Sequence, residues 1–189
     1  MKIKPLLFLL AIACYAAVQA QPQREIRRFE GELGGGVCFK GAGTDAGPAV
    51  FGEGRYNFGG VPVDLGIHIS FNAFDSRQGD YLFYHFMAVS DYNVRIGGRH
   101  ALFFGAGAGI GHFNAPEQGS CVGNTGLAFV FMPRVGIELF RHLRLAFDCK
   151  LMGKGYSHAG LSLGIAFGGG ARRKGHDPDH AGARRQPNP

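Results

Sequence analysis

The stretch that decides the fold is Leu102-Phe103-Phe104-Gly105-Ala106-Gly107-Ala108-Gly109-Ile110-Gly111-His112-Phe113. Because successive side chains of a β-strand point to opposite faces, this segment places a row of glycines on one face. The other face carries Leu102, Phe104, Ala106, Ala108 and Ile110. Glycine inside a strand marks a bend or a close backbone approach, which suits the narrow interior of an eight-stranded barrel.

The same two-residue period runs through other parts of the chain. Between Leu143 and Leu151, leucine, phenylalanine and cysteine alternate with Arg144, Ala146, Asp148 and Lys150. Residues 29–40, 63–72 and 160–167 alternate in the same way. A soluble sandwich also alternates, with its apolar face inward. Here the second face mixes charges of both signs with glycine and alanine, which favours an apolar exterior and a polar interior.

Turn-forming residues divide the chain into eight strand-like runs: 28–40, 49–58, 61–74, 81–95, 100–113, 126–139, 143–151 and 156–167. The runs have about 9–15 residues, whereas soluble strands most often have about 5–6 and a tilted membrane-spanning strand needs about 9–11. The links after odd-numbered runs are expected to be longer and more polar, with 114–125 the largest. The prediction is an all-β chain: an eight-stranded antiparallel up-and-down transmembrane β-barrel over residues 21–170.

Two segments fit this pattern less well. Leu82, Phe83, Tyr84 and Phe86 are nearly consecutive apolar residues, and we assign the aromatic ones to an interfacial girdle at the rim. Pro133 lies inside a strand but has no N–H to donate to a ladder, so we expect a β-bulge there.

The two ends of the chain differ from the middle. Residues 1–20 have the basic start, apolar run and small residues of a secretory signal peptide, with cleavage expected after Ala20. An uncleaved anchor or a lipoprotein at Cys14 are the alternatives. Residues 171–189 are basic and poor in apolar side chains, so we expect a disordered tail. His176 and His180 flank Pro178 there, and a solvated tail is favoured over a metal site.

Composition excludes several classes of protein. Charged residues make up 18% of the chain, and the formal net charge of +6 comes largely from the tail and the signal. A nucleic-acid-binding protein would need a basic patch on a folded face, and export argues against that partner. No apolar run is long enough for a transmembrane helix. We predict no cofactor and no metal.

The order and spacing of three segments carry a resemblance. Asp91-Tyr92-Asn93-Val94-Arg95, the glycine-rich segment from Phe104 to Gly111, and Arg134-Val135-Gly136-Ile137-Glu138-Leu139 resemble small outer-membrane β-barrel proteins of the OmpA/OmpX-like kind. The likeness runs from about residue 30 to residue 167. It implies residence in the outer membrane, contact with its lipids and assembly by the barrel-insertion machinery. Such barrels finish near a terminal aromatic residue, here Phe167, but this chain continues beyond it.

The inward-facing charges are the candidate site. In a narrow lumen they must pair or meet water, because an isolated buried charge is very costly. We expect an ion-pair ladder among Arg134, Glu138, Arg144 and Asp148, and a plugged lumen in preference to a selective pore. The predicted lumen residues are Glu30, Glu32, Glu53, Arg55, Asp64, Asp91, Arg95, Arg134, Glu138, Arg144, Asp148 and Lys150.

Other functions are weaker fits to the sequence. Some barrels of this size act on lipid A, but Ser157 and His158 are neighbours on a strand, so they point to opposite faces and cannot readily pair. A soluble lipocalin-like barrel would need an apolar interior. Cys38 and Cys121 could form a disulfide, and Cys149 faces lipid in this register. We expect a structural, anchoring or surface-contact role without catalytic residues, and the sequence does not identify the surface partner.

Overall fold

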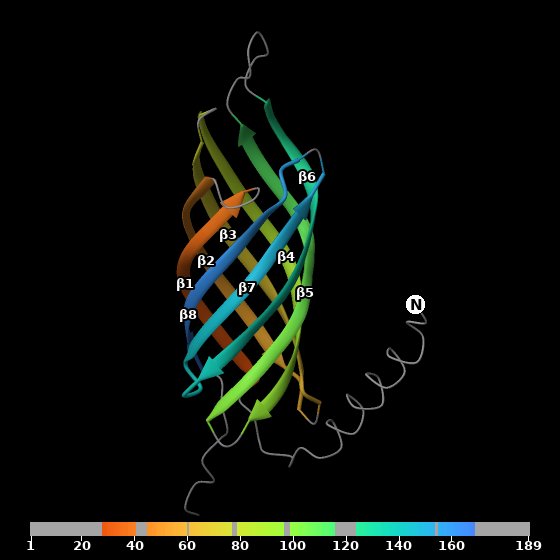
Figure 1. Ribbon diagram of the computed structural model, residues 1–189. Coiled ribbons are helices and arrows are strands. Elements are labelled where there is room, and N and C mark those ends of the chain that lie inside the picture. The colour runs from red at the N-terminus through yellow and green to blue at the C-terminus, as the bar shows by residue number, and fades with distance from the viewer. Residues whose placement is uncertain are drawn as a thin grey trace, which may run out of the picture.

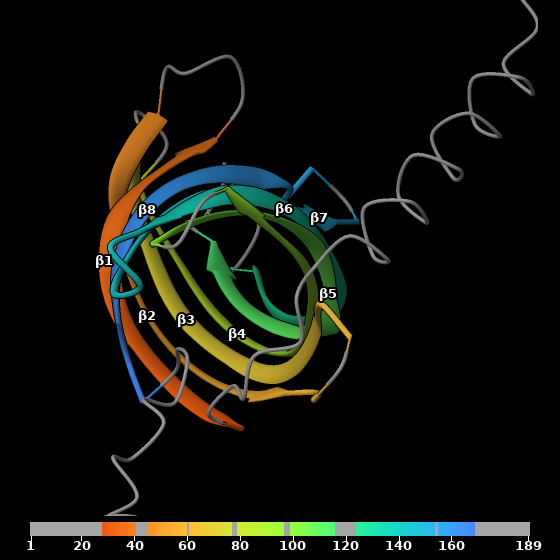
Figure 2. The same ribbon diagram turned by 90° about the horizontal axis from the view of Figure 1, so that it is seen from below.

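A computed structural model describes residues 28–40, 45–59, 61–76, 79–96, 99–115, 124–153 and 155–168. Eight antiparallel strands follow one another around a single barrel, and β8 pairs with β1 to close it (Figures 1 and 2). The fold prediction is confirmed. The strands are β1 (Phe29–Lys40), β2 (Asp45–Asn57), β3 (Val63–Ser76), β4 (Gly79–Ile96), β5 (His100–Ala115), β6 (Asn124–Leu139), β7 (Leu143–Met152) and β8 (His158–Phe167).

The barrel has two unlike ends. β1 begins and β8 finishes at the lower end of Figure 1, which also holds the turns after β2, β4 and β6. We call this the terminal end, and the other the loop end. The predicted signal peptide, its cleavage site at Ala20 and the predicted tail over 171–189 lie outside the described residues. None of the described residues forms a helix of the length and apolarity needed to cross a membrane.

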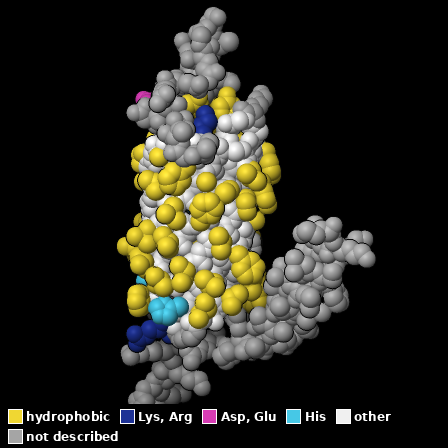
Figure 3. Space-filling model, viewed as in Figure 1, with side chains coloured by type: hydrophobic (Ala, Val, Ile, Leu, Met, Phe, Trp, Pro, Cys, Tyr) yellow, Lys and Arg dark blue, Asp and Glu magenta, His cyan; other side chains and the backbone are white. Residues whose placement is uncertain are grey.

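Alternation along each strand sorts the side chains between the two faces of the wall. Leu33 is 62% exposed and Ile165 54% exposed on the outside, whereas Arg55 is only 3% exposed on the inside. Figure 3 shows apolar side chains spread over the outer surface of the barrel wall. The exterior is therefore apolar and the charges lie within, as the sequence predicts.

The glycine row of β5 lines the interior because the wall leaves no room for side chains there. A Cβ atom added at Gly109 would overlap the carbonyl oxygen of Phe86 and the Cα of Met87 on β4. Both atoms belong to the backbone, so they cannot move aside as a flexible side chain could. Glycine thus permits the close approach of β4 and β5 at this point.

The links at the loop end are shorter than expected in two places. β2 begins at Asp45 and pairs there with Lys40, while Ser76 pairs directly with Gly79 across the β3–β4 hairpin. The expectation of long links after β1 and β3 is therefore wrong, because residues assigned to loops continue the ladders. The link between β5 and β6, residues 116–123, remains the longest.

The two irregular segments also behave differently from the prediction. On β4 the odd-numbered side chains, Phe83 among them, point inward, so the girdle prediction is wrong for Phe83; it stays a prediction for Tyr84 and Phe86, which point outward. Pro133 causes no bulge. Phe131 pairs with Leu151 and Arg134 with Asp148 in one unshifted register, so the pairing with β7 is interrupted at 132–133. Proline lacks only a donor, and skipping a bond does not require an extra residue.

The glycine row generates a test of packing. Gly109→Val should destabilise the barrel by about 1–3 kcal/mol, because the added side chain forces the backbone of β4 away. Gly54→Val is the matched control, since nothing lies within 4 Å of a Cβ at that position. Urea unfolding of the two refolded variants in detergent micelles measures the difference. Equal urea midpoints for the two variants would show that the close approach of β4 and β5 does not affect the stability of the barrel.

Candidate functional site in the barrel interior

Arg134 is the centre of a buried ionic cluster in the terminal half of the lumen. From β6 its Nε donates to Asp91 Oδ1 at 2.7 Å and its Nη2 to Asp91 Oδ2 at 2.8 Å. Nη2 also donates to Glu53 Oε1 at 2.7 Å. The guanidinium therefore joins β6 to β2 and β4 across the interior. Bidentate pairing of this kind is the strongest form of charge-assisted hydrogen bonding.

Two further arginines extend the cluster to the neighbouring strands. Arg55 pairs with Glu30 and, at 2.9 Å, with Glu32. Arg144 donates from Nη2 to Asp91 Oδ2 at 3.0 Å, and its guanidinium lies 3.8 Å from the centre of the Phe103 ring. One network thus links β1, β2, β4, β6 and β7. Because each charge has left water, its partners are what makes its burial tolerable.

The pairing differs from the expected ladder. Arg134 lies directly opposite Asp148, and Glu138 opposite Arg144, in the β6–β7 register. However, both arginines reach across the lumen to carboxylates on other strands, and Asp148 pairs with Lys150 at 2.6 Å on its own strand. The ladder prediction is wrong because it considered only adjacent strands. In a narrow barrel a long side chain can contact the far wall as easily as its neighbour.

The predicted lumen residues fall into three groups by burial. Glu30 and Glu138 are half-buried, and Arg95 is exposed at the terminal end of β4. None of the ion pairs among the described residues includes Glu138 or Arg95. The fully buried members are Glu32, Glu53, Arg55, Asp64, Asp91, Arg134, Arg144, Asp148 and Lys150.

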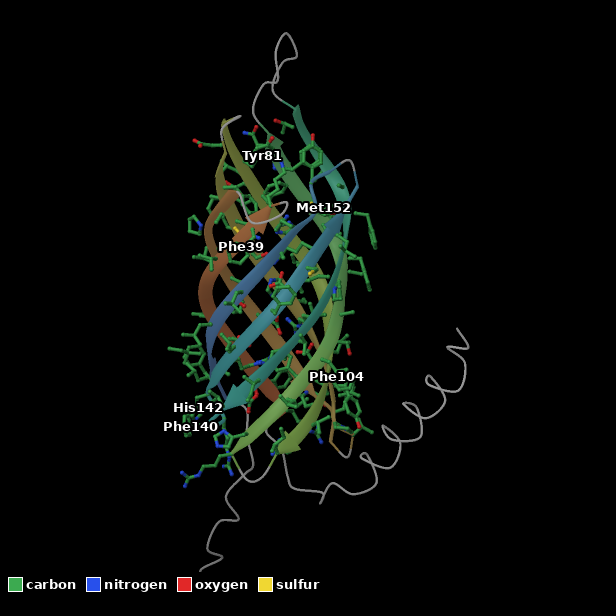
Figure 4. The ribbon with its side chains drawn as sticks, in the orientation of Figure 1. Phe39, Tyr81, Phe104, Phe140, His142 and Met152 are labelled. Atoms are coloured by element: carbon green, nitrogen blue, oxygen red, sulfur yellow. The ribbon has the colours of Figure 1, made fainter. Side chains whose placement is uncertain are left out.

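The loop half of the lumen is filled in a different way. An apolar cluster occupies it, with buried His85 and His158 packed against its rings, and Figure 4 labels Tyr81 and Met152 in this half. The Nζ of Lys40 lies 3.3 Å from the centre of the Tyr81 ring, a cation–π contact at the loop end of β1. Sequence reasoning missed this cluster because it expected charges along the whole interior. Its buried members are Cys38, Phe74, Tyr81, Phe83, Met87, Val89, Phe113, Val130, Met132 and Met152.

Three buried histidines lie between and within these two halves. His68 Nδ1 contacts Glu53 Oε2 at 2.8 Å, and His85 Nδ1 lies 3.2 Å from Ser70 Oγ. His158 Nδ1 donates to the carbonyl of Tyr156 at 3.1 Å, so its Nε2 accepts from Asn72 Nδ2 at 2.9 Å. The sequence analysis gave these histidines no role in the lumen. The alternation of side chains along β3, β4 and β8 already indicates that these histidines point into the lumen.

A small cavity lies in the described interior. A cavity beside the ionic cluster offers about 20 Å³ to the centre of a water molecule, which is room for about one water. Glu53, His68, Phe103, Met132 and Arg134 are among its lining residues. The cavity can hydrate the cluster, but it is too small for an organic ligand.

The remaining candidate residues have structural contacts. Cys38 is buried and has no disulfide partner among the described residues, and its Sγ donates to the carbonyl of Gly47 at 3.2 Å. Cys121 lies outside the described residues, so the proposed disulfide stays a prediction. Ser157 Oγ donates to the carbonyl of Met152 at 2.7 Å and accepts from its N–H, while His158 contacts Asn72 and Tyr156. Ser157 and His158 therefore do not form a nucleophile–base pair.

No protein-family model matches the sequence, and no curated protein matches it. Among solved structures, the barrel is similar to neisserial surface protein A (NspA), with a TM-score of 0.53 and 12% identity over 75% of this chain and 97% of that one. The N-terminal β-barrel domain of Pseudomonas aeruginosa OprF has a TM-score of 0.49 and 15% identity, covering 76% of this chain and 100% of that one. For the Yersinia pestis outer membrane protein Ail the values are 0.45 and 16%, covering 74% and 99%. The likeness to NspA shows the fold that the sequence resemblance implies.

The ionic cluster generates a test of electrostatic stability. Arg134→Met should destabilise the barrel by about 3–5 kcal/mol, because Glu53 and Asp91 lose their bidentate partner while remaining buried. Arg95→Met is the matched control: it removes the same charge from an exposed position and should stay within about 0.5 kcal/mol of the wild type. Urea unfolding of both refolded variants supplies the comparison. Equal urea midpoints for the two variants would show that the ionic cluster does not stabilise the barrel.

Proposed function

We propose that this chain is an integral outer-membrane β-barrel with a structural or anchoring role, a plugged lumen and a surface-contact wall at its loop end. The observation that carries the proposal is the inversion of the two faces of the wall. Apolar side chains cover the outside, and the inside holds the paired ionic cluster and the glycine row together with the apolar cluster of the loop half. Such a barrel satisfies every backbone group by closure, which is what a bilayer requires of a β-structure.

Aromatic side chains support the same placement. On the outer surface, Phe29 packs against Tyr56 with ring centres 5.3 Å apart near the terminal end, and Tyr92 packs against Phe104 at 5.1 Å. Toward the loop end, Phe71 and Tyr84 lie 4.9 Å apart. Aromatic pairs thus lie on the outer wall toward both ends of the barrel, where membrane-spanning barrels place their interfacial girdles.

The filled interior supports a plug in preference to a pore. The ionic cluster crosses the lumen through Arg134, and the apolar cluster occupies the half above it. An ion that crosses the lumen would have to break the ion pairs of the ionic cluster and lose its hydration water in the apolar cluster. A conducting lumen is thus the less favoured function for this chain, and a lipocalin-like binding cavity would have to displace the charged cluster.

The loop end offers a surface for contact with other molecules. The β6–β7 register begins at Val130, so residues 124–129 of β6 pair with β5 but with no described residue on their other side. Strands β3 to β6 rise above the rest of the barrel in Figure 1. Leu127 and Phe129 are 70% and 67% exposed on this extension. An open strand edge with apolar neighbours is suited to adding a strand from a partner.

The membrane placement is tested by a charge on the outer face. Phe147→Arg places the charge midway along β7, on the outer face, and should cost about 2–4 kcal/mol of folding free energy in phospholipid vesicles, because a bilayer midplane excludes the charge. Val61→Arg, at the terminal rim, should cost about 0–1 kcal/mol. Unfolding titrations of both variants in the same vesicles measure the effect. A wild-type protein that stays in the soluble fraction, or equal costs for the two substitutions, would refute the placement.

The plugged lumen is tested by conductance. The wild-type barrel, reconstituted in a planar bilayer, should show no stable single-channel steps, because both halves of its interior are filled. Its insertion is checked independently by the different migration of boiled and unboiled protein on a gel. Regular conductance steps from correctly folded protein would show that the lumen conducts ions and would refute the proposal of a plugged lumen.

A further inference from the structure

We propose that the terminal-end rim formed by the β4–β5 and β6–β7 turns binds the headgroup of an anionic phospholipid in the leaflet that surrounds this end, which is the periplasmic leaflet where short turns are periplasmic. The inference rests on the proposed membrane insertion and adds a specific lipid site to it. We call the site the turn patch and define it as Arg99, His100, Phe140 and Arg141. Figure 4 places Phe140 and His142 together at the lower, terminal end of the barrel.

The β6–β7 turn has an uncommon backbone for its residues. Phe140 and Arg141 have φ angles of 54° and 69°, and the N–H of His142 donates to the carbonyl of Leu139 at 3.2 Å. Turns with two left-handed central residues favour asparagine and glycine, and a bulky side chain there is an outlier. A local conformational cost of this kind persists at sites where the side chains themselves are required.

The strained turn presents Phe140 to the surroundings of the barrel. Phe140 is 61% exposed, and its ring lies edge-on to that of His100, with 5.2 Å between the centres. Ile96 and Leu102 lie on the outer face of the β4–β5 hairpin and are 50% and 42% exposed. The patch therefore borders the apolar belt, where an aromatic ring can enter the boundary between headgroups and acyl chains.

The charges beside Phe140 have the sign that a phosphate requires. Arg99 is exposed in the β4–β5 turn, and Arg141 is half-buried next to Phe140. Among the acidic residues of the described hairpins, Asp45, Asp75 and Asp80 lie at the loop end. Glu138 precedes Phe140 by two residues and is half-buried, and its strand position places it on the lumen face of β6. The face seen in Figure 3 likewise shows basic side chains and histidine below the apolar belt. Guanidinium groups bind phosphate oxygens through paired hydrogen bonds, and an anionic headgroup adds a net attraction.

Hydrogen bonds hold the turn against the barrel wall. The N–H of Ala166 donates to the carbonyl of His142 at 2.7 Å, and His142 Nδ1 donates to the carbonyl of Ala166 at 3.1 Å. The β6–β7 turn is thus attached to the end of strand β8. Because the backbone position is set before any lipid binds, little ordering cost opposes the contact.

The experiment compares lipid retention by barrels folded in mixed vesicles of phosphatidylcholine and phosphatidylglycerol. Native mass spectrometry counts the lipids of each kind that remain on the released protein. The wild type should retain phosphatidylglycerol in excess of its share of the vesicle. Arg99→Gln should reduce that preference about fivefold, the effect of one basic residue at an anionic surface.

A second variant separates the site from the stability of the turn. Phe140→Asn combined with Arg141→Gly installs the residue pair that this backbone favours, so the barrel should be at least as stable in phosphatidylcholine. It should nevertheless lose the phosphatidylglycerol preference. A variant that keeps the preference would overturn the proposal.

Arg28→Gln is the matched control, because Arg28 is an exposed arginine at the same end beside β1. It should retain the wild-type preference. An equal loss in this control would show diffuse attraction in place of a site, and a wild type without any preference would also refute the inference. Folding into pure phosphatidylcholine, followed by the gel shift of unboiled protein, tests insertion separately. Failure of the proposed function and failure of the lipid site are thereby distinguished.

Discussion

The closure of the sheet is the constraint on which the rest of the structure depends. Once β8 pairs with β1, every strand has two neighbours over most of its length, and the side-chain alternation of each strand is divided between one inside and one outside. A wall of eight strands encloses very little space. Most of the large apolar side chains must therefore face outward. The side chains that face inward must be small, be charged and ion-paired, or pack closely against one another.

The interior meets this constraint in two different ways along the axis. In the terminal half, three arginines from different strands pair across the lumen with four carboxylates, those of Glu30, Glu32, Glu53 and Asp91. In the loop half, aromatic rings and methionine side chains pack together, and Met87 and Met132 are fully buried. The ion pairs of the first half join β1, β2, β4, β6 and β7 across the lumen. The second half excludes water from above them.

Much of the architecture could be predicted because it depends on local periodicity. The alternation in β5 and β7 identified the outward face, and strand length distinguished a membrane wall from a soluble sheet. Contacts across the lumen could not be predicted in this way. The partners of Arg134 are Glu53 on β2 and Asp91 on β4. The residues that flank Arg134 in the sequence do not indicate these partners. Pro133 and Phe83 were misjudged for a related reason: the register of the surrounding strands decides their effect, and local composition does not show it.

The central claim is that the odd-numbered side chains of β7 face acyl chains while its even-numbered ones face the lumen. Spin labels attached singly at positions 143 to 151, in a background without native cysteines, measure this directly in phospholipid bilayers. Accessibility to dissolved oxygen should alternate, with maxima at 143, 145, 147, 149 and 151, and a water-soluble nickel complex should reach none of the mid-strand sites. Maxima at the even-numbered positions, or nickel accessibility along the odd-numbered face, would contradict the account.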